Sequence, residues 1–168
     1  APAAASATGI HAAIADTGEQ QTVTTDITQP DVPRNVTATA GGTANDIKAI
    51  QVVVNGTNEE DVAISETLPA FTVDTAGIVT GSKIFKTITS IVIPAHDGTG
   101  ATTAIGTGSK LGIGRRLRRN TVQRAYLNGV VEGTAPTVAT DSSAIESNSV
   151  ALDSALDGND VVVEFYDT

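Results

Sequence analysis

IKAIQVVVNG (Ile47–Gly56) and DVAISETL (Asp61–Leu68) are the two stretches of this sequence that decide its fold class. The first is rich in β-branched residues and ends in an Asn-Gly pair, the strongest short-range signal of a β-hairpin. In the second, Val62, Ile64 and Glu66 alternate with small residues, which is the period-2 pattern of a strand with two different faces. Together they predict two strands with a turn signal between them.

The same kind of run recurs along the chain. RNVTATAG (Arg34–Gly41) alternates in the same way, and SKIFKTITSIVIPA (Ser82–Ala95) reads as a long strand whose later half is buried and closed by a proline. A second Asn-Gly pair lies at 128–129, in the run TVQRAYLNG. The whole pattern indicates roughly ten strands at a spacing of about 8–12 residues, without helical stretches between them. We therefore predict an all-β fold, a β-sandwich of immunoglobulin-like or jelly-roll-like type.

The composition of the chain changes at Gly112-Ile113-Gly114, which we take as a domain boundary. Residues 1–18 are small and lack periodicity, so they are predicted to form an extended, flexible N-terminal arm. Residues 19–113 are predicted to form the sandwich. Residues 114–168 form either a smaller C-terminal β-module or the strands that complete the sandwich, and the sequence leaves both open.

The composition limits the chemistry that the chain supports. Its 168 residues carry a formal net charge of −9, contain only 3% aromatic residues and include no cysteine. The missing cysteines exclude disulfides, thiolate metal sites and a cysteine nucleophile. No run approaches the roughly 18–20 apolar residues of a membrane helix, so we expect no membrane partner.

The most unusual feature is a cluster of arginines in this acidic chain. Five of its ten Lys and Arg residues lie within ten positions: Arg115, Arg116, Arg118, Arg119 and Arg124. Arginine pairs with carboxylates in a bidentate manner and covers apolar surface with its stem. Leu111, Ile113 and Leu117 lie between the charges, which indicates a segment half-packed on a neighbour. We predict a protein interface with an acidic surface, on a sister subunit or on a larger lattice.

Two other readings of the arginines stay open. The loop is either solvated or paired within the chain, or it binds nucleic acid. Nucleic acid is disfavoured because Tyr126 is the one aromatic residue nearby for base stacking, and because the remaining chain is strongly acidic. We expect no nucleic-acid partner.

No catalytic, cofactor or metal site is predicted. Asp153, Asp157 and Asp160 are candidate Ca²⁺ ligands, but their spacing does not fit an EF-hand loop and Asp-Gly-Asn is a turn sequence. The glycine-rich run IGTGSKLGIG lacks the P-loop pattern. The two histidines, His11 and His96, fall in the predicted arm and in a predicted turn, so we expect the protein not to be an enzyme.

Four phrases, RNVTATAGG, VVVNGTNEEDVAISETL, GSKIFKTITSIVIPA and IGTGSKLGI, follow one another in an order that resembles a β-domain of virion structural proteins from tailed bacteriophages. NTVQRAYLNGVVEGTAPTVA and IESNSVALDSALDGNDVVVEFY resemble the usual continuation, so the resemblance covers about Arg34 to Tyr166. RRLRR is more basic than the usual continuation. The resemblance carries over no catalytic residues.

The resemblance implies a structural protein on the virion, made in the host cytoplasm and placed on the capsid surface. The expected role is that of a capsid decoration or cement protein that binds the major capsid protein and sister copies, with a homotrimer expected by analogy. Two alternatives remain: a tail- or fibre-associated adhesin that binds host surface glycan, and a secreted bacterial adhesive β-domain.

Overall fold

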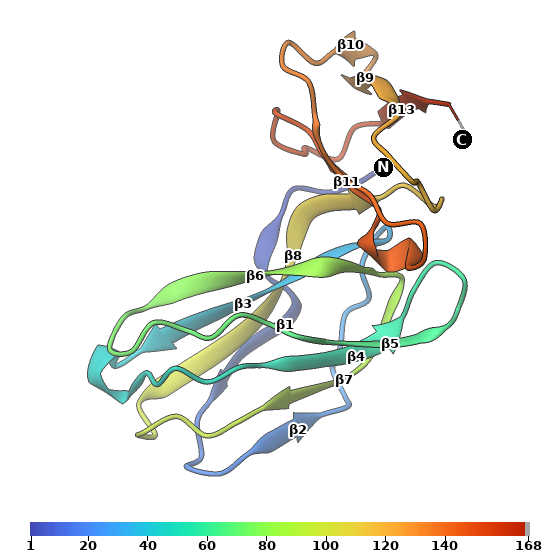
Figure 1. Ribbon diagram of the computed structural model, residues 1–168. Helices are drawn as coiled ribbons and strands as arrows, with labels where there is room; N and C mark the ends of the chain where they lie inside the picture. The colour runs from blue at the N-terminus through green and yellow to red at the C-terminus, as the bar shows by residue number, and fades with distance from the viewer. Residues whose placement is uncertain (167–168) are drawn as a thin grey trace.

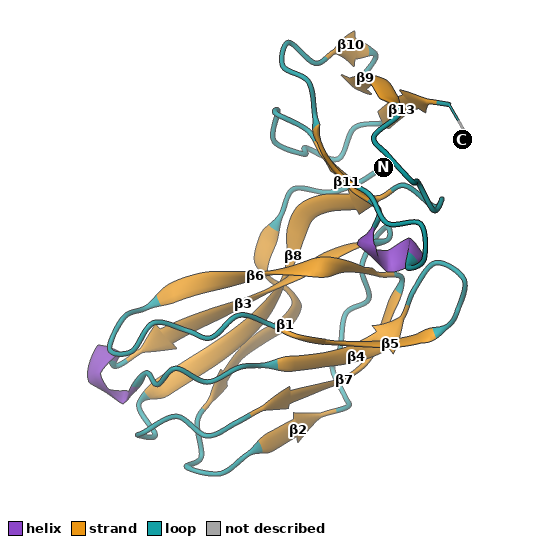
Figure 2. Ribbon diagram, viewed as in Figure 1, coloured by secondary structure: helices purple, strands orange, loops and turns teal. Residues whose placement is uncertain are grey.

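The computed structural model describes residues 1–166 and shows a β-sandwich with a small separate sheet at one end (Figure 1). Strands account for the regular structure, and two short 3₁₀ turns, η1 (Ala44–Asp46) and η2 (Ile145–Ser147), lie at opposite ends of the sandwich (Figure 2). The chain is all-β, as its alternating apolar pattern predicts.

The first sheet has the order β11-β12-β8-β3-β6, and β1 also pairs with β8. Its strands are β1 (Ser6–Ala15), β3 (Arg34–Gly42), β6 (Gly77–Phe85), β8 (Ala101–Gly112), β11 (Thr137–Ala139) and β12 (Ser149–Ala151). All pairs are antiparallel. The predicted alternation of β3 is confirmed, since Val36, Ala38 and Ala40 are buried in the core between the sheets.

The second sheet has the order β2-β7-β4-β5, from β2 (Gln21–Val23), β4 (Val53–Thr57), β5 (Ala63–Thr67) and β7 (Thr87–Ile93). The hairpin signal at Asn55-Gly56 is wrong, because both residues lie inside β4. The chain turns later, where Asn58 Oδ1 accepts the N–H groups of Glu60 and Val62, each at 3.0 Å. This local side-chain turn replaces the Asn-Gly turn that the sequence suggested.

The run predicted as one strand from Ser82 to Ala95 is two strands that belong to different sheets. The break falls at Lys86, whose N–H donates to the carbonyl of Thr57. Before it, β6 completes the first sheet; after it, β7 enters the second. Phe85 and Ile88 on either side are both buried, so the crossing is fixed by apolar side chains that enter one core from two directions.

The expected flexible arm of residues 1–18 differs from the structure, which places Ser6–Ala15 in the first sheet as β1. Small residues obscured the strand, but Ile10 is completely buried in the sandwich core. The strand is irregular, with two register shifts against β8. Its end is fixed by buried Asp16, whose Oδ1 accepts the N–H of His96 at 3.0 Å.

Residues 114–166 do both things that the sequence left open: some of their strands complete the sandwich, and others form a separate module. β11 and β12 extend the first sheet, whereas β9 (Val122–Leu127), β10 (Val130–Val131) and β13 (Val161–Phe165) form a separate sheet of order β10-β9-β13. We call this sheet the C-terminal sheet. The second Asn-Gly pair forms the turn between β9 and β10, with φ of 51° at Asn128 and 75° at Gly129.

The C-terminal sheet packs on the end of the sandwich through a second, smaller apolar cluster. Its buried members are Leu111, Val150 and Leu156. Leu111 is the penultimate residue of the long strand β8, and the chain leaves that strand directly into the arginine-rich segment. The arginines therefore lie at the junction between the two parts of the fold.

Candidate interaction surface

The arginine-rich segment between β8 and β9, residues 113–121, forms a loop that we call the arginine loop. The side chains of two buried residues fix the position of this loop. Leu117 is completely buried, and its N–H donates to Oδ1 of Asn148 at 3.0 Å. Asn148 is itself fully buried, and its Nδ2 donates to the carbonyls of Asp141 and Ala144, each at 2.8 Å. One amide thus joins the arginine loop to the segment before β12.

Arg116 is fixed by an ion pair within the chain. Its guanidinium pairs in a bidentate manner with the carboxylate of Glu60, and its Nε donates to the carbonyl of Ser143 at 3.1 Å. This hydrogen-bonded guanidinium lowers the pKa of Glu60, and Glu60 in turn raises the pKa of Arg116. The structure therefore shows Arg116 paired within the chain, which is one of the alternatives that the sequence left open.

Three other arginines of the arginine loop lack such partners in the described part of the chain. Arg115, Arg118 and Arg119 are exposed, and within residues 1–166 they form no ion pair or side-chain hydrogen bond. Arg124 is also exposed but lies on β9, opposite Glu164 of β13. The structure brings four of the predicted interface arginines together on one loop and places the fifth on the C-terminal sheet.

A half-buried carboxyl lies beneath the arginine loop. Glu59 accepts a hydrogen bond from the N–H of Gly114, while its Oε2 is buried without a hydrogen-bond partner among residues 1–166. Burial raises the pKa of Glu59, and the N–H of Gly114 and the charge of Lys86 only partly oppose this. The loop is thus supported by a group that favours its neutral form more than an exposed glutamate does.

Two of the candidate metal-binding or catalytic residues, Asp157 and His96, have local structural partners. Asp157 accepts hydrogen bonds from the backbone N–H and the side chain of Asn159, at 3.0 and 2.8 Å. Across the described chain, no cluster of three or more His, Cys, Asp or Glu side chains is arranged to hold a metal ion. His96 is buried; its Nδ1 accepts the N–H of Lys48 at 3.1 Å, and its Nε2 lies 3.0 Å from the Thr103 hydroxyl.

Sequence reasoning missed a buried arginine that joins three segments. Arg34 is 1% exposed and donates from Nε to the carbonyl of Gly108 at 2.9 Å. Its Nη1 donates to the carbonyl of Ala3 at 3.0 Å and pairs with Asp31 at 2.9 Å. Burial disfavours the charged form of Asp31, but hydrogen bonds from Ala3 and Arg34 outweigh it and lower the pKa. The position of Arg34 at the start of a strong strand pattern gave no signal of this role.

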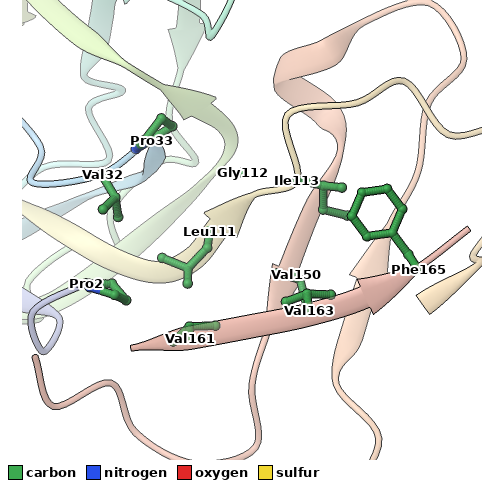
Figure 3. A pocket seen from close by; sticks show the side chains of 10 residues that line it. All are labelled: Pro2, Val32, Pro33, Leu111, Gly112, Ile113, Val150, Val161, Val163 and Phe165. Carbon is green, nitrogen blue, oxygen red and sulfur yellow. The ribbon is translucent and has the colours of Figure 1, made fainter. Parts of the chain in front are cut away.

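An apolar cavity of about 300 Å³ lies between the sandwich and the C-terminal sheet. Figure 3 shows Leu111, Val161 and Val163 around it, with Pro2 closing one side. The N-terminus reaches this place because the carbonyl of Pro2 accepts the N–H of Gly158 at 3.0 Å. The cavity separates two apolar surfaces that only partly fill the space between them.

No helix in the described part of the chain has the length and apolar character needed to cross a membrane. Comparison with family models, with curated proteins and with solved structures found no match.

Proposed function

We propose that this chain is a structural virion protein of a tailed phage, a capsid decoration or cement protein that attaches through its arginine loop. One observation carries the attachment site: Arg115, Arg118 and Arg119 are exposed on a loop whose own position is fixed by Leu117, Asn148 and the Arg116–Glu60 pair. The phage assignment itself rests on the sequence resemblance over Arg34 to Tyr166.

A fixed loop makes these arginines suitable for binding. Exposed arginines on a mobile segment lose side-chain and backbone entropy when they dock, whereas a segment already held in place loses less. The proposed partner is an acidic protein surface, because guanidinium groups bind carboxylates in a planar, bidentate geometry. The net charge of −9 opposes long-range approach to nucleic acid.

Binding of many copies to a repeating capsid lattice compensates for weak individual contacts. Exposed ion pairs contribute only about 0–1 kcal/mol each, so one loop gives modest affinity. Copies that also contact one another, as a trimer or in another arrangement, gain from an effective concentration of about millimolar. Stabilisation of the head then follows from binding that favours the assembled lattice.

Add-back to particles tests the attachment site. Particles from a lysate whose gene for this chain carries a stop codon are mixed with purified protein and sedimented. The triple variant Arg115→Ser, Arg118→Ser and Arg119→Ser is expected to lose most of its binding at low salt. The control is Lys48→Ser, which removes one exposed positive charge, paired with Asp97, near η1 at the far end of the sandwich. Equal binding of the triple variant and the control would contradict the proposed site.

The glycan-binding alternative is supported by one separate feature. A hollow of about 260 Å³ is lined by the hydroxyl residues Ser6, Thr80, Thr107 and Ser109, beside the apolar Ala5, Ala7 and Ile78. Such a neutral, hydroxyl-rich surface fits a sugar. Binding on a glycan array that is lost on Thr80→Val would favour an adhesin over a decoration protein.

A further inference from the structure

The outer face of the C-terminal sheet exposes an unusual amount of apolar surface. Val131 is 48% exposed and Val162 is 52% exposed, and Tyr166, which follows the end of β13, is 53% exposed. Val131 and Val162 both lie directly opposite Tyr126 of the central strand β9, so these side chains share one face. The opposite face, with Ala125, Val161 and Val163, is turned toward the sandwich.

The same face carries one charge of each sign. Arg124 of β9 and Glu164 of β13 are direct cross-strand partners, next to the row formed by Tyr126 and Val162. Both are exposed, and the Tyr126 hydroxyl donates to Glu164 at 3.2 Å. Within residues 1–166 the guanidinium of Arg124 forms no ion pair. An acidic partner protein would leave Glu164 facing like charge, whereas a surface with both signs would satisfy both residues.

We propose that this face binds the same face of a second copy of the chain. Consider a two-fold axis that lies in the interface, parallel to the strands and between β9 and β13. A rotation about this axis keeps each row at the same height and places β9 of one copy over β13 of the other. Arg124 then faces Glu164 of the second copy, and Tyr126 faces Val162, each contact occurring twice. The strands of the two sheets run nearly aligned, as in ordinary sheet-on-sheet packing.

The size of the face makes this contact weak in dilute solution. Three strands about 4.8 Å apart, with about 3.3 Å per residue along six residues, cover roughly 300 Å² per copy. A stable interface buries about 800 Å² on each partner. We therefore expect a weak contact that is populated only at high protein concentration, comparable with the roughly millimolar effective concentration of copies held side by side. This self-association is a property of the free protein and does not require the proposed attachment to a capsid.

A charge-swap experiment tests the proposal. Arg124→Glu and Glu164→Arg are purified separately, and sedimentation velocity at about 1 mM protein and low salt gives the weight-average mass. Each variant alone places like charges opposite each other twice, so its self-association is expected to weaken roughly tenfold relative to the unaltered protein. In a 1:1 mixture, the introduced glutamate of one variant faces the introduced arginine of the other, and the native Glu164 of the first faces the native Arg124 of the second. The mixture is expected to associate about as strongly as the unaltered protein.

A pair of neighbouring valines provides a matched control. Val131→Lys lies on the proposed face and is expected to abolish the association, while Val130→Lys, 69% exposed and on the opposite face of the same strand, is expected to leave it unchanged. The proposal is overturned if the mixture has the average mass of its two components measured alone. It is also overturned if the two valine variants behave alike.

Discussion

Replacing Asn148 with alanine is expected to destabilise the protein by about 3–5 kcal/mol. The amide forms four hydrogen bonds of 3.0 Å or shorter: it accepts from the N–H groups of Leu117 and Asp141, and it donates to the carbonyls of Asp141 and Ala144. Each bond contributes about 1 kcal/mol net, and a buried group left without a partner costs about 1–3 kcal/mol. The loss is a large part of the roughly 5–15 kcal/mol that holds a domain folded.

Urea unfolding followed by circular dichroism, with linear extrapolation, measures this loss. The matched control is Asn120→Ala in the same loop, because Asn120 is exposed and accepts a single backbone N–H, that of Val122, at 2.9 Å. The control is expected to cost less than about 1 kcal/mol. Hydrogen exchange at the Leu117 amide should rise strongly in Asn148→Ala and little in the control. A loss no larger than that of the control would refute the view that this amide fixes the arginine loop.

Three further results are expected. Gly56→Ala should destabilise the fold by more than about 3 kcal/mol in urea unfolding, since an added Cβ would lie 1.9 Å from the Thr87 carbonyl oxygen, whereas Gly77→Ala, with open space around it, should be tolerated. Burial lowers the pKa of His96, so the unfolded chain binds the proton at a higher pH than the folded chain does. Stability should therefore fall as the pH drops below about 6.5. Melting temperatures at several pH values should show a smaller decline in His96→Gln. Burial raises the pKa of Glu59, so ionisation of this carboxyl opposes folding at neutral pH. Glu59→Gln should therefore raise the melting temperature at neutral pH. It should have no such effect below about pH 4.5, where Glu59 is protonated in the unfolded chain as well.

Local pattern was sufficient for the fold class and for individual strands. The alternation in RNVTATAG follows directly from β3 having one face in the core, and Asn128-Gly129 forms the turn expected of that pair. Local pattern failed where a distant segment decides the outcome. Asn55-Gly56 lies inside β4, where the carbonyl of Thr87 on the neighbouring strand approaches so closely that only glycine fits at position 56.

The interaction surfaces were predictable only in part. The arginine cluster was evident from charge alone, but Arg116 could not be separated from its neighbours because its partner, Glu60, lies 56 residues away. The outer face of the C-terminal sheet was only weakly marked in DVVVEFY, because Val162 interrupts the charged positions Asp160 and Glu164 and continues the apolar run of Val161 and Val163. Its sides become distinct only when Val161 and Val163 pack toward the sandwich and leave Val162 exposed.

Fractionation of the source lysate on a density gradient, followed by mass spectrometry of each band, tests the virion assignment most directly. We expect this chain in the band of DNA-filled particles, in a fixed ratio to the major capsid protein, with release by high salt because exposed arginines hold it there. Recovery of the chain in the soluble or cell-envelope fractions, with none in the particle band, would contradict the assignment.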